Sequence, residues 1–278
     1  MGVKDLLVHV NVSKHCRGRL EIAAQLAKAF DAHLTGLFTS AASDVPFFMM
    51  EEIAAKIEPT MRAWWMQMRD NAKAEFEAFR QKSGVAADWL DVEGDASETA
   101  CYHARYADLT VVGQIDPEEL LPRPEYGVPE RVALESGRPV LIVPYAGKFT
   151  DVGKQILVAW NGSAQSSRAV NDALPFLAKA ERVTVLTINP DNLRKGTIDR
   201  PGTHIAAHLM RHGIKADVRE LAVDDIAVDD MILSQASDEA ADLIVMGAYG
   251  HTRAHEIVLG GATRALFKHM TVPILMSH

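Results

Sequence analysis

The sequence predicts an α/β protein made of two tandem, Rossmann-like domains, each with a doubly wound, five-stranded parallel sheet. Three observations predict this fold. First, 278 residues are enough for two domains that each bury a core. Second, short apolar runs typical of strands alternate with helical stretches. Third, the chain repeats itself: Lys4–Ser13 aligns with Lys154–Ser163 at a shift of 150 residues, and Ala107–Gly113 aligns with Ala241–Gly247 at a shift of 134.

The change in shift places about sixteen extra residues in the first half, and a tandem duplication explains the pattern most simply. The joint falls near residues 144–150, where Pro144 and Gly147 are typical of a linker. The predicted domains are therefore residues 1–148 and residues 149–278.

Each half contains five candidate strands in the same order. The first-half strands are Asp5–Val10, His33–Phe38, Asp88–Val92, Leu109–Gly113 and Val140–Val143. The second-half strands are Gln155–Trp160, Arg182–Ile188, Asp217–Glu220, Leu243–Gly247 and Ile274–Ser277. Helices are expected between them, among them Gly18–Phe30 and Gln165–Leu177, because each has apolar residues at helical spacing on one face. A ligand of such a sheet binds at the carboxyl ends of the strands, where the strand order reverses.

Composition limits the classes of function. A net charge of −8 gives no basic footprint for nucleic acid or for an anionic membrane surface. No apolar run approaches the roughly 20 residues that span a bilayer. The first residues lead directly into a strand without a signal-peptide layout, and two cysteines, Cys16 and Cys101, are too few for a disulfide framework. We expect a cytoplasmic protein that binds neither nucleic acid nor membrane.

One stretch near the end carries the strongest functional signal. The buried strand of Leu243–Gly247 runs into glycines, and Gly260 and Gly261 precede a helix expected over Thr263–His269. A helix N-terminus presents free N–H groups and suits a phosphate, and Thr263 adds a hydroxyl. The stretch lacks the Gly-Lys-Ser/Thr ending of a P-loop and the G-x-G-x-x-G of a dinucleotide site. Glycines that serve only as turn and cap residues are the alternative.

The spacing G-x2-G-x9-G of Gly247, Gly250 and Gly260 resembles the nucleotide-binding signature of the universal stress protein family, although that family usually has Ser or Thr in place of Gly261. The resemblance covers essentially the whole chain. It implies binding of ATP or another adenine nucleotide, with Mg²⁺ as companion, in a stress-response regulatory role. The implied site consists of Ala159, Trp160, Asn161, Met246, Gly247, Gly250, Gly260, Gly261, Ala262 and Thr263. In this family the residue at position 161 is usually Asp and contacts the nucleoside, so Asn161 keeps an acceptor oxygen and gains two N–H donors.

The first half departs from the signature at the matching positions. Asp116 stands in place of Gly250, Tyr126 in place of Gly260 and Pro129 in place of Thr263. A carboxylate repels a polyphosphate, and proline offers neither an N–H group nor a hydroxyl. We expect a degenerate copy of the nucleotide loop, retained for packing or for a different ligand.

The first half's extra residues fall within the segment Pro46–Ser83, which places Met and Trp side chains at near-helical spacing, among them Trp64 and Trp65. A covering helix is one interpretation, and an interaction surface for a protein partner is the other. A nucleotide-free scaffold protein is therefore an alternative function, and a slow ATP hydrolase is a second one, although no general base is evident. The family resemblance also implies that the halves form a pseudo-dimer within one chain by pairing their last strands, Val140–Val143 and Ile274–Ser277. A further homodimer of chains is left open.

Overall fold

The computed structural model describes residues 2–40, 51–119, 127–190, 201–223, 225–248 and 261–278. The chain divides into two compact units, residues 3–132 and residues 133–278 together with the first two residues. Each unit is described below by itself. The domain boundary predicted between residues 148 and 149 separates the two sequence repeats and differs from this division between residues 132 and 133. It stays a prediction.

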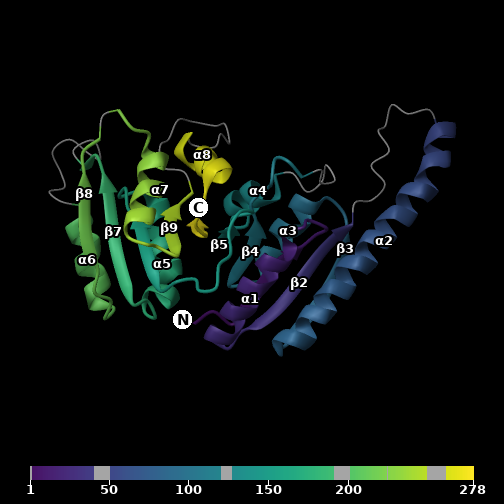
Figure 1. Ribbon diagram of the computed structural model, residues 1–278, viewed down its shortest axis with the longest axis horizontal. Coiled ribbons are helices and arrows are strands. Elements are labelled where there is room, and N and C mark those ends of the chain that lie inside the picture. Colours follow the sequence, from purple (N-terminus) through teal and green to yellow (C-terminus); the bar gives the residue numbers. More distant parts are fainter. Residues whose placement is uncertain (1, 41–50, 120–126, 191–200, 224, 249–260) are drawn as a thin grey trace. The chain divides into compact units, whose positions relative to one another are not determined.

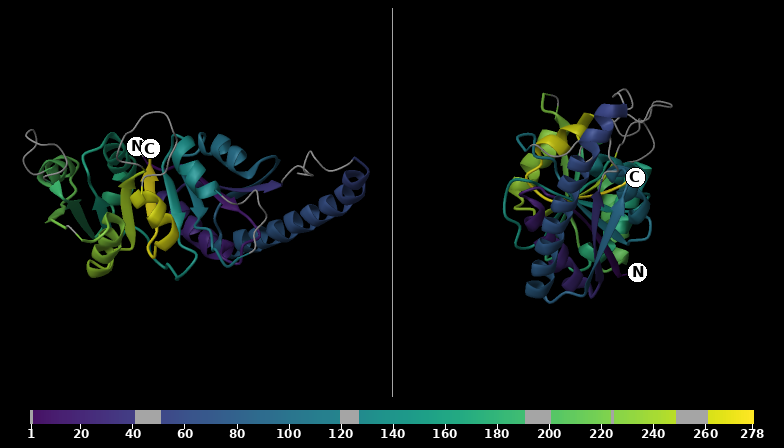
Figure 2. Two further views of the ribbon diagram at one scale, coloured as in Figure 1. Left: turned by 90° about the horizontal axis from the view of Figure 1, so that it is seen from above. Right: turned by 90° about the vertical axis from the view of Figure 1, so that its right-hand side faces the viewer.

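The first unit is built on a parallel sheet in the order β3-β2-β1-β4. Its strands are β1 (Asp5–Val10), β2 (His33–Ser40), β3 (Ala87–Glu93) and β4 (Leu109–Gly113). Its helices are α1 (Cys16–Phe30), α2 (Glu51–Ser83) and α3 (Ala96–Ala104), and α4 (Val128–Glu135) follows β4 and continues past the end of this unit. Helices α1 and α2 lie on one face of the sheet and α3 lies on the other (Figures 1 and 2). This is the doubly wound arrangement that the sequence predicts.

The second unit has the strand order β5-β10-β9-β6-β7-β8. Its strands are β5 (Val140–Val143), β6 (Gln155–Ala159), β7 (Arg182–Ile188), β8 (Asp217–Leu221), β9 (Leu243–Gly247) and β10 (Ile274–Ser277). Its helices are α5 (Ala164–Leu177), α6 (Pro201–Arg211), α7 (Val228–Asp238) and α8 (Gly261–His269). Strands β6 to β10 pair in parallel, with α5 and α6 on one face and α7 and α8 on the other (Figure 2).

The two last strands of the sequence repeat pair with each other. Strand β5 runs antiparallel to β10, with Ile142 opposite Ile274 and Val140 opposite Met276. Every residue of both strands is buried. This confirms the expected pairing. It gives hydrogen-bond partners to backbone N–H and C=O groups that each strand would otherwise leave exposed at a sheet edge.

Helix α2 covers most of the segment Pro46–Ser83 and packs on the first unit's sheet. The ring of Phe76, which is fully buried, lies against Gly36 of β2, where a side chain would overlap it. The helix continues through Pro59. Trp65 is 8% exposed and Trp64 is 43% exposed, so one tryptophan belongs to the core and the other faces solvent. The covering-helix interpretation is therefore confirmed, with an exposed aromatic side chain in addition.

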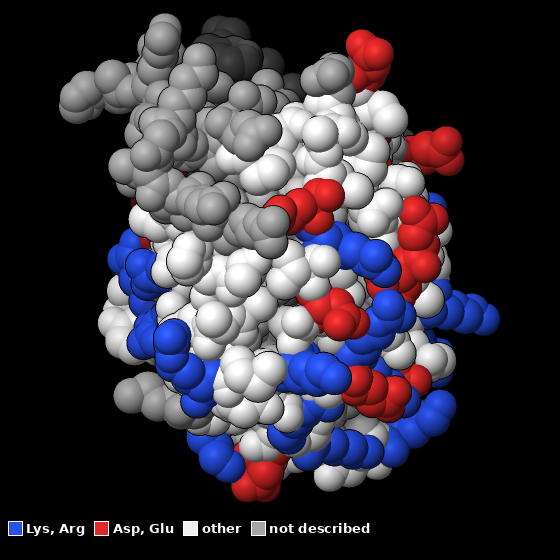
Figure 3. Space-filling view, turned by 90° about the vertical axis from the view of Figure 1, so that its left-hand side faces the viewer, with Lys and Arg blue, Asp and Glu red and all other residues white. Residues whose placement is uncertain are grey.

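Strand β8 is the edge of the second unit's sheet, and four of its five residues are exposed. Arg182 on β7 and Arg219 on β8 both form ion pairs with Glu239, at 2.7 and 3.3 Å. On this face basic and acidic side chains are interspersed (Figure 3). Charged residues on an edge strand discourage pairing with another chain.

Among the described residues, no helix combines the length and the apolar composition needed to cross a membrane.

Candidate functional site

The predicted site residues meet where the strand order of the second unit reverses. Strand β6 comes first in the sequence of this half, yet it lies between β9 and β7. Ala159, the last residue of β6, is opposite Met246 of β9, and Gly247 ends β9 one residue later. The carboxyl ends of β6 and β9 therefore form the switch point at which open α/β sheets bind ligands.

Gly247 is required by the close approach of a helix. A Cβ atom at this position would lie 2.5 Å from the Ser166 backbone nitrogen and 2.6 Å from the Gln165 carbonyl carbon. Both atoms belong to the first turn of α5, so the N-terminus of this helix packs directly on the end of β9. Only glycine permits this contact, which places the positive end of the α5 dipole beside the switch point.

The turn between β6 and α5 is held by its own side chains. The Asn161 Oδ1 atom accepts a hydrogen bond from the Ser163 backbone N–H at 3.1 Å. Gly162 has a φ of 71°, which favours glycine. The Ser163 hydroxyl accepts from the Ser166 backbone N–H at 3.1 Å, which confirms it as the N-cap of α5. Among the described residues, none accepts a hydrogen bond from the half-buried Asn161 amide nitrogen, so its two N–H groups stay available to a ligand.

The other predicted residues divide between described and undescribed parts of the chain. Trp160 is half-buried and continues the ladder, because its backbone N–H donates to the Leu186 carbonyl at 2.8 Å. Gly261, Ala262 and Thr263 form the first turn of α8, in which Thr263 is 3% exposed. Gly250 and Gly260 lie outside the described residues.

The opposite, amino-terminal ends of the strands show a contact that sequence reasoning missed. The Asp242 carboxylate accepts hydrogen bonds from the backbone N–H groups of Gly153, Lys154 and Gln155 at 2.8 to 3.2 Å. Burial raises the pKa of this carboxyl, and the three N–H groups oppose that shift. At the matching position of the first unit, Asp108 accepts from the backbone N–H groups of two residues at the start of β1, at 2.7 and 3.1 Å. The sequence does contain a signal for this contact. The same three residues, Ala-Asp-Leu, occur at 107–109 and 241–243, where β4 and β9 begin.

Residues 153–278, which contain this switch point, match the model of the Universal stress protein family. This half therefore carries a universal stress protein domain. A stretch of 151 residues is 29% identical to Universal stress protein Slr1230 of Synechocystis sp. (strain ATCC 27184 / PCC 6803 / Kazusa). The match covers 52% of this chain, and the chain spans about half the length of that relative, 49%.

Solved structures show the same fold over nearly the whole chain. A universal stress protein from Archaeoglobus fulgidus DSM 4304 superposes with a TM-score of 0.72 at 15% identity, covering 98% of this chain and 97% of the other. A functionally unknown protein, PA1789, from Pseudomonas aeruginosa PAO1 superposes with a TM-score of 0.62 at 13% identity, covering 99% and 92%. At these identities the likeness establishes the α/β fold and no more.

The first unit has the same switch point, between β1 and β4, and fills it with protein atoms. Arg19 of α1, which is 3% exposed, lies against Gly113 at the end of β4 and donates from Nη2 to Asn11 Oδ1 at 2.8 Å. Its Nε atom is buried without a hydrogen-bond partner among the described residues. Burial, together with the Arg19 charge, lowers the pKa of His9 to about 3, so His9 is neutral at pH 7. The described residues leave a cavity of about 10 Å³ here, room for about one water.

Two carboxylates from the segment after β4 pack against this switch point of the first unit. Asp116 accepts from Lys14 Nζ at 2.9 Å and interacts with His15 Nε2 at 3.0 Å. Glu119 accepts from the Ser13 hydroxyl at 2.7 Å and from the Lys14 backbone N–H at 2.8 Å. A carboxylate thus occupies donors at the start of α1 that would otherwise suit a phosphate. Among the described residues, His15, Asp116 and Glu119 also form the one cluster with metal-ligand spacing, but the Lys14 ammonium already neutralises Asp116.

Replacing Asp116 by asparagine should destabilise the first unit in a pH-dependent way. Hydrogen bonds from His15 and Lys14 hold the pKa of the Asp116 carboxyl well below its ordinary value of 3.8. A lowered folded-state pKa means that the ionised group stabilises the fold above pH 3.8, and this contribution is lost as the pH falls through the folded-state pKa. We expect the melting temperature of Asp116→Asn to lie below that of the parent at pH 7, and the gap to narrow steadily below pH 3.8.

The matched control is Asp88→Asn, because the Asp88 side chain is 79% exposed and its pairing with His33 is open to solvent. An exposed pair contributes little to stability, so this variant should follow the parent at every pH. A gap between Asp116→Asn and the parent that is the same at pH 7 and pH 3 would contradict the assignment.

Proposed function

We propose that the second half binds an adenine nucleotide, with ATP as the candidate, at the carboxyl ends of β6 and β9, in a stress-response regulatory role. The observation that supports this most is the contrast between the two switch points. In the first unit Arg19, Asp116 and Glu119 fill the site. In the second, Ala169, Gly250 and Arg253 stand at the matching sequence positions, so a bulky cation and two carboxylates are replaced by small or basic residues.

The described residues of the second unit supply complementary parts for a nucleotide. The Asn161 amide can donate to ribose or base, and the helix N-termini of α5 and α8 provide positive potential for phosphates. Mg²⁺ fits this site only as a companion of the nucleotide. Asn161 Oδ1 already accepts from the Ser163 N–H, and Mg²⁺ is commonly held by substrate phosphates and water.

An ATP titration tests the proposal. At about 100 times the dissociation constant, ATP should stabilise the parent protein by roughly 2.7 kcal/mol, seen as a rise of a few degrees in melting temperature. We expect one nucleotide per chain. Gly250→Asp should abolish the rise, because it introduces the first half's carboxylate into the nucleotide loop. Calorimetry gives the stoichiometry, and product detection after long incubation tests slow hydrolysis.

Asp116→Gly is the matched control, since it makes the reverse exchange in the first half. It should lower the starting melting temperature, because Lys14 and His15 lose their partner, and leave the ATP-induced rise intact. If ATP produces no rise in the parent, or an equal rise in Gly250→Asp, the nucleotide assignment is wrong. The scaffold function then takes its place, since Trp64 and Met66 of α2 are 43% and 50% exposed.

A further inference from the structure

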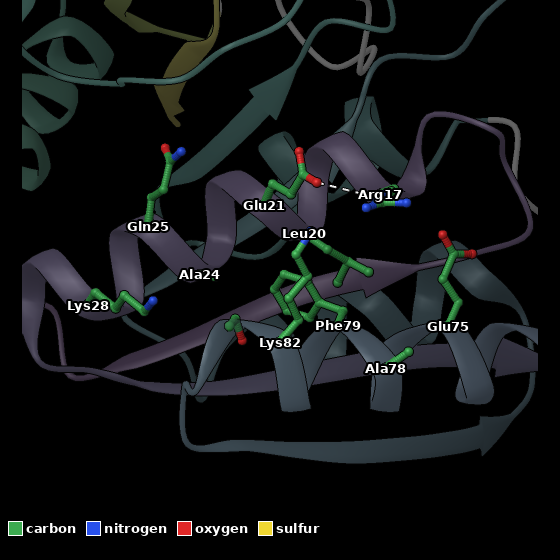
Figure 4. Close-up of a pocket in the computed structure, with 11 residues that line it drawn as sticks. Arg17, Leu20, Glu21, Ala24, Gln25, Lys28, Glu75, Ala78, Phe79 and Lys82 are labelled. Atoms are coloured by element: carbon green, nitrogen blue, oxygen red, sulfur yellow. Dashed lines mark hydrogen bonds and ion pairs between the residues drawn. The ribbon is translucent and has the colours of Figure 1, made fainter.

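The first unit contains a groove between α1 and α2, far in the sequence from the proposed nucleotide site. Its volume is about 380 Å³, within the range of small-ligand sites. The floor is apolar and comes from both helices: Leu20 and Ala24 on α1, and Ala78 and Phe79 on α2 (Figure 4). Alanine on each helix leaves the space open, since larger side chains there would fill it.

The charges around the groove are unevenly distributed. Arg17 and Glu21 form an ion pair at 3.2 Å and so neutralise each other. Lys28 and Lys82 belong to the last turns of α1 and α2, and neither forms an ion pair with a described residue. In Figure 4 the side chains of Lys28 and Lys82 reach toward the groove, whereas Glu75 lies near its opposite end. In a protein with a net charge of −8, this end of the groove is locally positive.

We propose that this groove binds an anionic amphiphile, a medium-chain alkyl carboxylate. The alkyl chain would lie on Leu20, Ala24 and Phe79, where each buried methylene contributes hydrophobic free energy. The carboxylate would lie at the end of the groove formed by the last turns of α1 and α2, where Lys28 and Lys82 line it. Two cations that form no ion pair with a described residue favour a carboxylate over a neutral alcohol or an amine of the same length.

Calorimetric titration with octanoate and decanoate, below the concentrations at which they form micelles, tests the apolar part. We expect saturable binding of one molecule per chain. Two extra methylenes should tighten binding about fifteenfold, because each contributes roughly a fourfold change in affinity. No saturable binding, or equal affinity for the two chain lengths, would overturn the proposal.

The carboxylate part is tested by comparison with decanol, using the double variant Lys28→Gln and Lys82→Gln. The parent should bind decanoate severalfold more tightly than decanol at low salt. The double variant should lose this preference and keep its affinity for decanol. If decanol and decanoate bind the parent equally, the groove does not select an anion and the proposal fails.

The location is tested by filling the groove. Ala78 is exposed, so Ala78→Phe places a ring over the floor without entering the core, and it should abolish decanoate binding. The matched control is Ala63→Phe, another exposed position of α2 that does not line the groove, and it should bind as the parent does. Unchanged binding by Ala78→Phe overturns the location. If instead Ala78→Phe dissolves a dimer seen by light scattering, while decanoate leaves that dimer intact, a second copy of the chain is the occupant and the proposal is wrong.

Discussion

Replacing Phe76 by alanine is expected to lower the free energy of unfolding of the first unit by about 3–5 kcal/mol, the usual cost of removing a fully buried aromatic ring. The ring lies on Gly36 of β2, and its centroid is 5.4 Å from that of Trp89 on β3. It therefore joins α2 to two strands at once. Urea unfolding followed by tryptophan fluorescence, with hydrogen exchange of β2 and β3 peptides to assign the change to this unit, measures the loss.

Phe79→Ala is the comparison within the same helix. Phe79 is one turn away, only half-buried, and contacts Phe76 at a centroid distance of 6.3 Å. Its removal leaves less of a cavity, so we expect a clearly smaller loss. If both variants lose the same free energy, or if Phe76→Ala loses less than about 1 kcal/mol, then α2 does not cover the sheet through Phe76.

The strands could be predicted closely because their signal is local. Six of them, including β1, β4 and β9, have the same bounds in the sequence prediction and in the structure. Each of those three is a short, mostly apolar run that aligns with a similar run in the other half of the chain. Strand β3 is longer than predicted by one residue at each end, Ala87 and Glu93, because pairing with β2 extends it. Pairing of this kind is set by tertiary contacts that no local pattern reveals.

The contents of the first switch point could be predicted only in part. The sequence identified Asp116 as a group that repels phosphate, but it did not show that Asp116 and Glu119 bind Lys14 and Ser13. Arg19 was missed altogether. A charged residue beside the apolar positions of a helix is ordinarily solvated, and only the packing of α1 on Gly113 shows that this guanidinium is buried.

For the second switch point, the family resemblance placed Asn161, Met246 and Gly247 in one site. The structure has Met246 and Gly247 at the end of β9, beside the end of β6, which Asn161 follows by two residues. The predicted loop residues Gly250 and Gly260 lie outside the described residues, as does the chain between them. Whether this segment approaches the α8 N-terminus closely enough for phosphate binding therefore stays a prediction. The ATP titration of Gly250→Asp addresses it directly.

Replacing Gly247 by alanine is expected to cost about 3 kcal/mol, at the upper end of the range for overpacked sites. The added Cβ would lie 2.5 Å from the Ser166 nitrogen and 2.8 Å from the Gln165 Cβ atom. The first of these is a backbone atom of α5, so no side-chain rotation relieves the overlap. The helix or the end of β9 has to move, and both border the proposed nucleotide site. Denaturant unfolding followed by hydrogen exchange of β6 and β9 peptides measures the loss of stability in this unit. ATP titration of the folded protein measures the effect on nucleotide binding.

Gly162→Ala separates steric overlap from backbone conformation in the same unit. A Cβ atom at Gly162 meets nothing within 4 Å, but its φ of 71° is unfavourable for alanine by roughly 1–2 kcal/mol. Gly247→Ala should therefore be the more damaging variant, and the only one of the two that shifts α5 against β9. Hydrogen exchange should rise at the first turn of α5 in Gly247→Ala and stay at the parent level there in Gly162→Ala. Equal losses and unchanged exchange in both variants would show that the contact between β9 and α5 tolerates a side chain, and that glycine at position 247 serves another purpose.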